Sequence, residues 1–383
     1  PLTAVIRLKE PNPFFHVDAL MPGFGSAIVP RRAVEELGEN FARRPAGSGP
    51  FEFASYTPQE GVVLRAFAGH HAGRPPADEV RFRYMPDSNA RTIAFIGREL
   101  ETIGGVRDPR WVDRIRQAAP GAVVDVLMPG SLVFIYFNMS RRPFDDIRVR
   151  QAIAHTLDRR LWARAFGVLA GPLPGIVPES FFGALPAAAI PAELRYAQDL
   201  DRARRLLAEA GFPNGFQVEA IASERADYRQ HMLMVQDQLR RVGIDVQLRM
   251  LDHASYHADI RRDRGSIVLL STAMSPNAAT VLGEFLSAAA IGGRPTANRN
   301  FSHYGEIGGA IDEELAAAVA APDSARQLEL LHAAQVKVLR DLPVFPLMTL
   351  GLVAARQANV DLGYRPVAGY GWYDLARARL VRG

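Results

Sequence analysis

The stretch SLVFIYFN (Ser131–Asn138), followed by PFDDIRVRQAIAHTLD (Pro143–Asp158), decides the fold. Leu132–Phe137 is a continuous apolar and β-branched run that is too short for a typical helix, which predicts a strand covered on both faces. After the turn residues, Asp145 or Asp146 is placed to cap a helix whose apolar residues follow helical spacing. A doubly buried strand that leads into an amphipathic helix predicts an α/β lobe.

Length and composition limit the class of protein. With 383 residues the chain is too long for one ordinary core, so we expect two or more lobes. It contains no cysteine, which excludes disulfides, cysteine nucleophiles and thiolate metal sites. No apolar run approaches the ~18 residues of a membrane span. The net charge is +4, but the basic residues are spread among acids without a basic block, so no nucleic acid partner is expected.

Further strands are predicted along the chain, with helical spacing between several of them. The strand candidates are Ala4–Leu8, Phe51–Tyr56, Gly61–Ala66, Phe216–Ala222, Ile244–Met250, Ile267–Leu270, Val344–Leu350 and Leu352–Ala355. Phe51–Tyr56 and Gly61–Ala66 are predicted to pair as a hairpin. The strands at Phe216–Ala222 and Ile244–Met250 flank a helical segment, which predicts a β-α-β unit.

Several segments resemble one family. FNMSRRPFDDIRVRQAIAHTLDR (Phe137–Arg159) resembles the signature of the family 5 extracellular solute-binding proteins, which are the oligopeptide-, dipeptide- and nickel-binding components of ABC importers. GSGPF (Gly47–Phe51) is similar to the GTGPY turn of that family, and Tyr196–Phe216 is similar to its helix with an AGF ending. The resemblance implies a periplasmic-binding-protein-like α/β fold of class II, cluster C type, with two α/β lobes joined by crossing hinge strands.

The resemblance also predicts the lobe boundaries. Residues 1–130 and 344–383 are expected to form lobe I, with a remnant of the small extra domain near residues 1–45, and residues 131–343 are expected to form lobe II. The chain begins inside a predicted strand and carries no signal peptide. Against the family pattern it looks N-terminally truncated, with part of the N-terminal lobe missing, and the expected location is the periplasm or the cell surface.

The best ligand candidates lie in the loop Ser271–Thr280. This loop follows a buried strand at its carboxyl end, where α/β folds place ligands. The candidate residues there are Ser271, Thr272, Met274, Ser275 and Asn277. In peptide-binding relatives the corresponding loop supplies an Asp that pairs with the α-ammonium of the peptide. Here the matching residue is Met274, with no acid between Ile267 and Gly283, which disfavours a free peptide N-terminus.

Other ligand candidates lie elsewhere in the chain. They are Asn300 and Tyr304, in a segment that resembles the N-x-S-x-Y motif of the family, Asn89 and Arg91 at a helix start, and Trp372 and Tyr373 near the C-terminus.

Metal and catalytic sites are not expected. His253 and His257 have the i, i+4 spacing of a two-histidine metal site, but no Glu follows His253 and the helix is polar, so we interpret them as two solvated histidines. No Gly-x-Ser-x-Gly, Walker A or Gly-x-Gly-x-x-Gly motif is present. We therefore expect no catalytic residue, no metal and no cofactor.

The resemblance implies a substrate-binding protein of an ABC importer, which captures a peptide-like or other small solute between two lobes and delivers it to a membrane permease. The alternatives are a receptor for a nickel chelate or metallophore, and an enzyme on the same scaffold. The implied partners are the solute and the permease and ATPase subunits. The protein is expected to be a monomer and peripheral to the membrane.

Overall fold

The computed structural model describes residues 27–292, 294, 299–366 and 373–381, together with residues 3, 5–9 and 15. The chain divides into two compact units. The first comprises Pro1–Asp18 and Pro129–Gly351, and the second comprises Ala19–Met128 and Leu352–Gly383. The boundaries inside the chain lie a few residues from the predicted ones, but Pro1–Asp18 belong to the first unit and not with the rest of predicted lobe I. The extent of the two lobes stays a prediction. No helix in the described ranges combines the length and apolar character that crossing a membrane requires.

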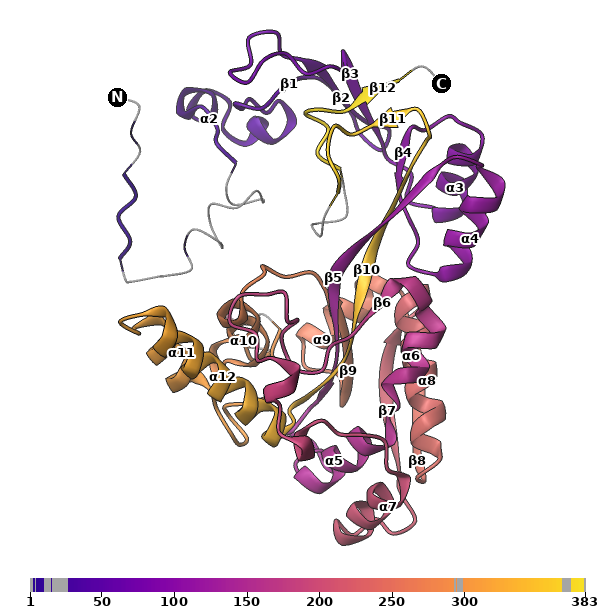
Figure 1. The fold of residues 1–383 in the computed structure, drawn as a ribbon, viewed down its shortest axis with the longest axis vertical. Helices are drawn as coiled ribbons and strands as arrows, with labels where there is room; N and C mark the ends of the chain where they lie inside the picture. Colours follow the sequence, from indigo (N-terminus) through magenta and orange to yellow (C-terminus); the bar gives the residue numbers. More distant parts are fainter. Residues whose placement is uncertain are drawn as a thin grey trace. The chain divides into compact units, whose positions relative to one another are not determined.

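The second unit contains a three-stranded antiparallel sheet in the order β1-β2-β3 (Figure 1). Its strands are β1 (Phe51–Thr57), β2 (Gly61–Ala66) and β3 (Glu79–Arg83). The predicted hairpin is confirmed, because Phe51 pairs with Ala66 and Thr57 with Gly61. The other elements of this unit are α2 (Arg31–Leu37), α3 (Ser88–Ile96), β4 (Thr102–Gly104), α4 (Pro109–Ala118), β11 (Val360–Asp361) and β12 (Arg379–Leu380).

Strands β5 (Val123–Phe137), β9 (Ile267–Thr272) and β10 (Val344–Arg356) join β4 in the main sheet of the molecule. The strand order is β4-β10-β5-β9, with β6 (Ala170–Gly171) paired to β10. Strand β5 is antiparallel to β9. Leu132–Phe137 is completely buried, which confirms the strand covered on both faces. Both β5 and β10 have residues in each of the two units.

Two strand predictions are wrong. Val344–Leu350 and Leu352–Ala355 were expected as separate strands but form the continuous strand β10, because residues on either side of Gly351 pair with β6 and with β4. Residues 5–8, of the predicted strand Ala4–Leu8, are not in a strand, and Ala4 lies outside the described residues. An extended segment forms a strand only where a neighbour supplies ladder hydrogen bonds, and none is described for these residues.

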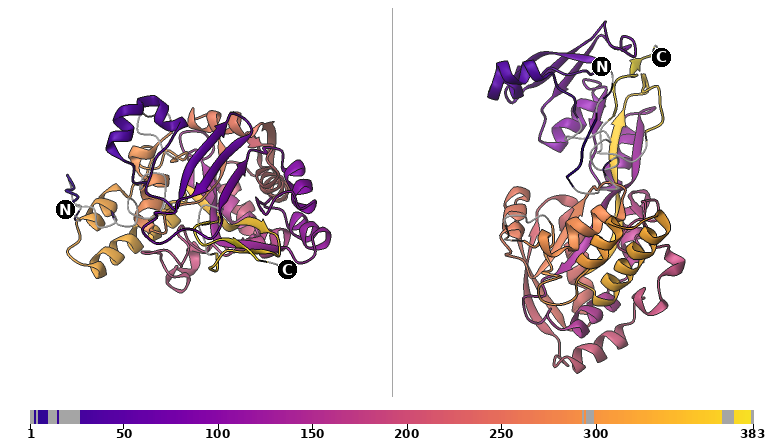
Figure 2. Two further views of the ribbon diagram at one scale, coloured as in Figure 1. Left: turned by 90° about the horizontal axis from the view of Figure 1, so that it is seen from above. Right: turned by 90° about the vertical axis from the view of Figure 1, so that its left-hand side faces the viewer.

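Most helices of the first unit begin at a short polar side chain that caps them, whereas α8 and α11 have no side-chain cap. Asp146 accepts a hydrogen bond from the backbone N–H of Arg148, so Asp146 and not Asp145 caps the helix that follows β5. The helices are α5 (Ile147–Thr156), α6 (Arg159–Phe166), α7 (Leu200–Glu209), α8 (Ala226–Arg240), α9 (His253–Arg261), α10 (Ala278–Leu286), α11 (Asp312–Val319) and α12 (Ser324–Asp341). Helices α11 and α12 pack together on one side of the main sheet (Figures 1 and 2).

The predicted β-α-β unit is confirmed. Strands β7 (Phe216–Ser223) and β8 (Ile244–Leu251) are parallel, with Phe216 opposite Ile244, and α8 connects them. Gly215 and Gly243, just before these strands, approach closely: a Cβ on Gly215 would lie 2.0 Å from the carbonyl oxygen of Gly243. Glycine is required there because any side chain would force the backbones apart.

Candidate functional site

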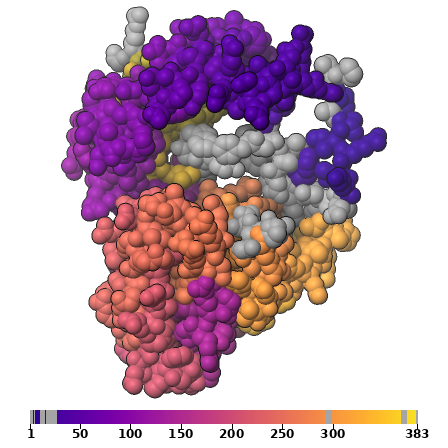
Figure 3. All heavy atoms as spheres, turned by 180° about the vertical axis from the view of Figure 1, so that it is seen from behind, coloured from indigo at the N-terminus to yellow at the C-terminus, as the bar shows by residue number. Residues whose placement is uncertain are grey.

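The carboxyl ends of β7 and β9 lie side by side, because Tyr228 near the start of α8 holds the last residues of β9. The Tyr228 hydroxyl donates to the carbonyl of Ser271 at 3.1 Å and accepts from its N–H at 2.9 Å. The residues that follow β7 are therefore next to the predicted ligand loop, whose residues 272–277 we call the edge loop. In Figure 3 the segment that carries β7, β8 and β9 forms the salmon-to-orange part of the surface.

Arg225 is held rigidly at this edge. Its Nε donates to Oδ1 of Asp227 at 2.7 Å, and its Nη2 donates to Oδ2 at 3.0 Å, a two-point contact with the carboxylate. The guanidinium lies 4.5 Å from the centre of the Tyr228 ring. Its side chain is 36% exposed, whereas that of Asp227 is 5% exposed. The result is a cation that several contacts hold in place and that solvent still reaches.

His253, at the start of α9, completes the arrangement. Nη1 of Arg225 donates to Nε2 of His253 at 2.8 Å. A guanidinium can only donate, so Nε2 carries the lone pair and Nδ1 carries the proton. Nδ1–H then donates to the hydroxyl of Ser223, the last residue of β7, at 2.9 Å. We call Ser223, Arg225, Asp227, Tyr228 and His253 the edge cluster.

His257 packs edge-to-face against the edge cluster. Its ring centre lies 4.5 Å from that of His253 and 6.0 Å from that of Tyr228. Burial is the main cause that lowers the pKa of His257 to about 4, and the neighbouring basic groups His253, Arg261 and Arg225 add to it. The prediction of two solvated histidines is therefore wrong, because aromatic packing and the arginine hold both rings. Among the residues that the structure describes, no group of three His, Asp or Glu could hold a metal ion.

The edge loop is ordered by its own backbone and by α10. The N–H of Asn277 donates to the carbonyl of Ser275 at 2.8 Å, and Oδ1 of Asn277 caps α10 by accepting from Ala279 at 2.9 Å. Asn277 is fully buried. The hydroxyl of Thr272 donates to the carbonyl of Ala273 at 3.3 Å. The structure thus places Thr272, Met274, Ser275 and Asn277 in the edge loop, and the fifth predicted residue, Ser271, directly before it in β9.

Met274 lies beside a charged pair. Nη1 of Arg299 is 2.8 Å from the Met274 sulfur, and the same nitrogen forms an ion pair with Glu284. Glu284 follows directly after the acid-free range Ile267–Gly283, so an acid does lie near the loop, but Arg299 neutralises it. The side chains of Arg299 and Glu284 are 31% and 35% exposed.

Asn300 and Tyr304 are buried, and both make hydrogen bonds inside this unit. Nδ2 of Asn300 donates to the carbonyls of Ser287 and Tyr304, both at 2.9 Å, and Oδ1 accepts from the hydroxyl of Ser302 at 2.8 Å. The Tyr304 hydroxyl donates to Asp341 at 2.7 Å, and burial raises its pKa. Their contact with a ligand stays a prediction.

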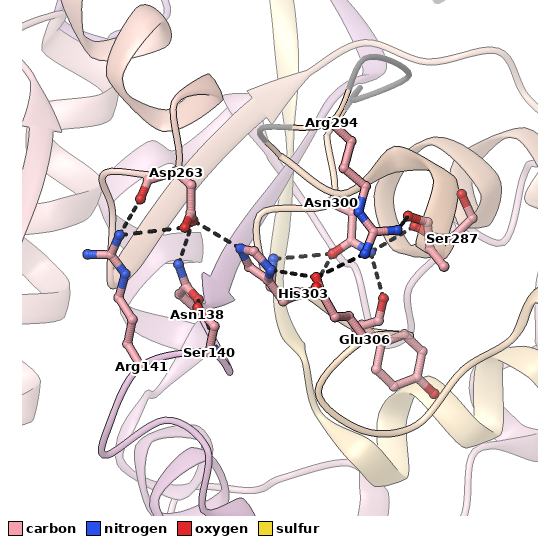
Figure 4. Close-up of polar contacts among 12 residues, drawn as sticks. Asn138, Ser140, Arg141, Asp263, Ser287, Arg294, Asn300, His303 and Glu306 are labelled. Atoms are coloured by element: carbon pink, nitrogen blue, oxygen red, sulfur yellow. Dashed lines mark hydrogen bonds and ion pairs between the residues drawn. The ribbon is translucent and has the colours of Figure 1, made fainter.

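A polar network fixes the loop that carries Asn300 (Figure 4). Nε2 of His303 lies 3.1 Å from Asp263, and its Nδ1 lies 3.0 Å from Glu306. Hydrogen bonds to Asp263 and Glu306 raise the pKa of His303, against the effect of burial. Asn138, at the end of β5, donates to Asp263 at 2.7 Å, which ties the network to the main sheet.

The remaining candidates belong to the second unit. Asn89 is exposed in the first turn of α3, and Arg91 donates to the carbonyls of Met85 at 2.6 Å and Gly104 at 3.1 Å. The Tyr373 hydroxyl donates to Asp125 at 2.7 Å. Trp372 lies outside the described residues.

Sequence reasoning missed Arg225, Asp227 and Tyr228. A signal was available, because the rule that ligands bind at the carboxyl ends of strands applies to Ser223 as it does to Ser271. The assembly around Arg225 could not be anticipated, since its partners come from separate segments.

Three comparisons place this geometry among known proteins. The model of the bacterial extracellular solute-binding proteins, family 5 Middle, matches residues 1–293. The glutathione-binding protein GsiB of Shigella flexneri is 26% identical over 383 residues, covering 98% of this chain and 72% of GsiB. The structure of MoaA from A. tumefaciens R10 in complex with mannopinic acid is 32% identical, with a TM-score of 0.80 and coverage of 94% of this chain and 71% of MoaA.

A third protein is similar in fold alone. The structure of DppA from Helicobacter pylori in complex with the peptide STSA is 21% identical, with a TM-score of 0.73, and covers 93% of this chain and 68% of DppA. These structures are periplasmic binding proteins, so the predicted fold class is confirmed.

Proposed function

Because the chain belongs to the bacterial extracellular solute-binding proteins of family 5, we propose that it binds a small carboxylate-bearing solute through the edge cluster. The chain is a solute-binding component of an ABC importer, which acts outside the cytoplasm and has the solute and the importer as partners. The proposal adds that it is a monomer, peripheral to the membrane, in the periplasm or attached to the cell surface, and without catalytic activity.

In this proposal the two units act as the two lobes that close on the solute. The predicted lobes are residues 1–130 with 344–383 for lobe I and residues 131–343 for lobe II. The supporting feature is that β5 and β10 each have residues in both units, as hinge strands do. The contacts predicted from the second unit, Asn89, Arg91 and Tyr373, remain part of the proposal.

The fixed position of Arg225 is the observation that supports the proposed solute class. Its guanidinium is fixed by Asp227 and His253 at the carboxyl end of a parallel strand, and part of it is accessible. A planar guanidinium that is already oriented binds a carboxylate at little entropic cost. Since Asp227 balances its charge, the solute also needs other polar groups that match the hydroxyls and backbone of the edge loop.

The surroundings of Met274 favour an acid of the opine type over a free peptide. Arg299 neutralises the nearest acid, Glu284, so no unpaired carboxylate is described there for an ammonium group. The chain is 32% identical to the MoaA structure, which holds mannopinic acid, against 21% for the DppA structure, which holds a peptide. GsiB, which is named for glutathione, supplies the second candidate.

Isothermal titration calorimetry with four solutes tests the proposal. Mannopinic acid is expected to bind most tightly, glutathione more weakly, and the dipeptide Met-Leu and a nickel chelate at least 100-fold more weakly than mannopinic acid. Tightest binding of the nickel chelate would favour a metal-chelate receptor, and tightest binding of Met-Leu would overturn the argument from Met274.

Variants at the two ends of α8 test whether the solute binds at the edge cluster. Arg225→Gln is expected to weaken binding of the preferred solute about 10- to 100-fold, the usual range for a charge-assisted hydrogen bond. Arg240→Gln removes the same charge at the exposed far end of the helix and is expected to change affinity less than 2-fold. Equal affinities for the two variants would contradict the assignment of Arg225.

A further inference from the structure

The first unit contains a pocket of about 510 Å³ at the β6 edge of the main sheet. Three arginines line it: Arg159, Arg160 and Arg195. Much of the rest of its wall is apolar and includes Ala163, Leu173, Ile190, Leu347 and Met348. We call this the arginine pocket. Its volume lies within the range of small-molecule sites, about 300–1,000 Å³.

Among the described residues, the contacts of the Arg159 guanidinium are with backbone carbonyls and an aromatic ring. Its Nε donates to the carbonyl of Pro346 at 2.8 Å, and its Nη1 donates to that of Arg195 at 3.1 Å. The guanidinium lies 4.2 Å from the centre of the Phe345 ring. No carboxylate in the described part of the chain lies within ion-pair distance of it. By contrast, Arg160 is paired with Asp158 at 2.9 Å.

Arg150, in the same unit, differs from Arg159 in the charges around it. Burial lowers the pKa of both Arg150 and Arg159 to about 10, so both are protonated at neutral pH. For Arg150 the nearby charges of Asp341, Asp146 and Asp145 oppose the effect of burial. For Arg159 burial acts without a compensating acid. A partly buried cation without a counter-charge is costly, and an anion from outside relieves that cost.

We propose that the arginine pocket is a second ligand site, which binds a small organic carboxylate with its anionic group on Arg159 and its hydrocarbon part against Leu173, Ile190, Leu347 and Met348. The charge selects an anion, and the apolar wall selects a hydrocarbon chain. This site is separate from the edge cluster, and it stands whether or not the solute assignment is correct.

Isothermal titration calorimetry with octanoate tests the site, with octanol and octyl phosphate as the matched probes. Octanoate is expected to bind with one-site stoichiometry and at least 10-fold more tightly than octanol. The same binding is expected in the Arg225→Gln protein, which separates this site from the edge cluster. Absence of saturable octanoate binding, or equal affinity for octanol, would overturn the proposal. Tighter binding of octyl phosphate than of octanoate would overturn the choice of a carboxylate and identify an organic phosphate as the ligand class.

Two variants of α6 locate the binding. Arg159→Gln is expected to weaken octanoate binding at least 10-fold, whereas Arg164→Gln, on the exposed side of the same helix, is expected to change it less than 2-fold. Because Arg159→Gln removes contacts to the backbone and can impair folding, Ala163→Trp provides an independent test. Ala163 is exposed and lines the pocket, so an indole there fills the space without removing a charge. Octanoate binding that survives Ala163→Trp in a folded protein would refute the site.

Discussion

Two arginines of the same unit are held in opposite ways. Arg225, in the edge cluster, contacts both carboxylate oxygens of Asp227 and is surrounded by polar side chains. Arg159, in the arginine pocket, donates to two backbone carbonyls and faces an apolar wall. The partner of a cation therefore determines which ligand it selects. An arginine that is paired with a carboxylate binds a polar solute through its oriented hydrogen-bond donors. An arginine without a carboxylate partner attracts an anion with its full positive charge.

Removing the acid from the edge cluster tests the contrast between the two arginines most strongly. Asp227→Ala leaves Arg225 without its carboxylate, and we expect the free energy of unfolding to fall by about 2 kcal/mol, less than for a fully buried pair because Arg225 is partly exposed. Urea denaturation measures the change. Glu224→Ala, at an exposed neighbouring position, is the control and is expected to cost less than about 0.5 kcal/mol. Equal costs would show that the pair is not structural.

The converse experiment places an acid in the arginine pocket. Ala163→Glu gives Arg159 the counter-charge that it lacks, and we expect octanoate affinity to fall about 10-fold because two carboxylates then compete for one guanidinium. Ala163→Gln has nearly the same volume without the charge and is expected to lower the affinity less than 3-fold. Calorimetry with both variants gives the comparison, and an equal loss in the two would mean that volume and not charge controls this pocket.

The two regions also differ in their response to pH. In the folded protein the pKa of His257 is lowered to about 4, from 6.5 in an unfolded chain. Between these values the unfolded chain binds a proton that the folded protein does not, so stability falls as the pH is lowered from 6.5 to 4. We expect His257 to contribute on the order of 1 kcal/mol to this loss, since partial exposure screens the shift.

Thermal unfolding of the wild type and of His257→Gln at pH 7 and pH 4.5 measures the effect. The variant is expected to lose less stability than the wild type on acidification. Octanoate binding to the arginine pocket is expected to change little between pH 7 and pH 8, because Arg159 stays protonated. An identical loss for both proteins would mean that His257 is not the titrating group.

The smallest expected effect concerns the edge loop. Met274→Asp adds a negative charge beside Arg299, and we expect it to weaken binding of a carboxylate solute about 3-fold through screened repulsion. Met274→Leu keeps the apolar volume and serves as the control. Octanoate affinity is expected to stay the same in both variants. A gain in affinity for the carboxylate solute would place its carboxylate away from Met274.

The sequence predicted those elements whose determinants are local. The buried strand at Leu132–Phe137 and the β7-α8-β8 unit follow from apolar periodicity and helix signals within one segment. The sequence predicted two strands in place of β10, because glycine often weakens or interrupts a strand and Gly351 lies in its middle. The strands that pair with β10 on either side of Gly351 come from distant parts of the sequence, so local periodicity does not reveal them.

The candidate site was only partly predictable for the same reason. The edge loop follows a recognisable strand, so Ser271 could be named from position. Arg225 depends on Asp227 nearby and on His253 from another segment, and such convergence is a property of the fold. The prediction of solvated histidines failed because both lie on α9, which looks polar in the sequence. In the structure the ring of His257 packs against those of Tyr228 and His253.

The sharing of β10 between the two units has a consequence for the order in which the strands of the main sheet can pair during synthesis. Within the main sheet, Thr349 of β10 pairs with Gly171, so part of that sheet waits for a segment made almost 180 residues later. At about 5–20 residues per second, this delay is on the order of ten seconds or more. During that interval the edge of β5 that β10 later covers lacks its neighbour, which makes it a natural place for a chaperone to act.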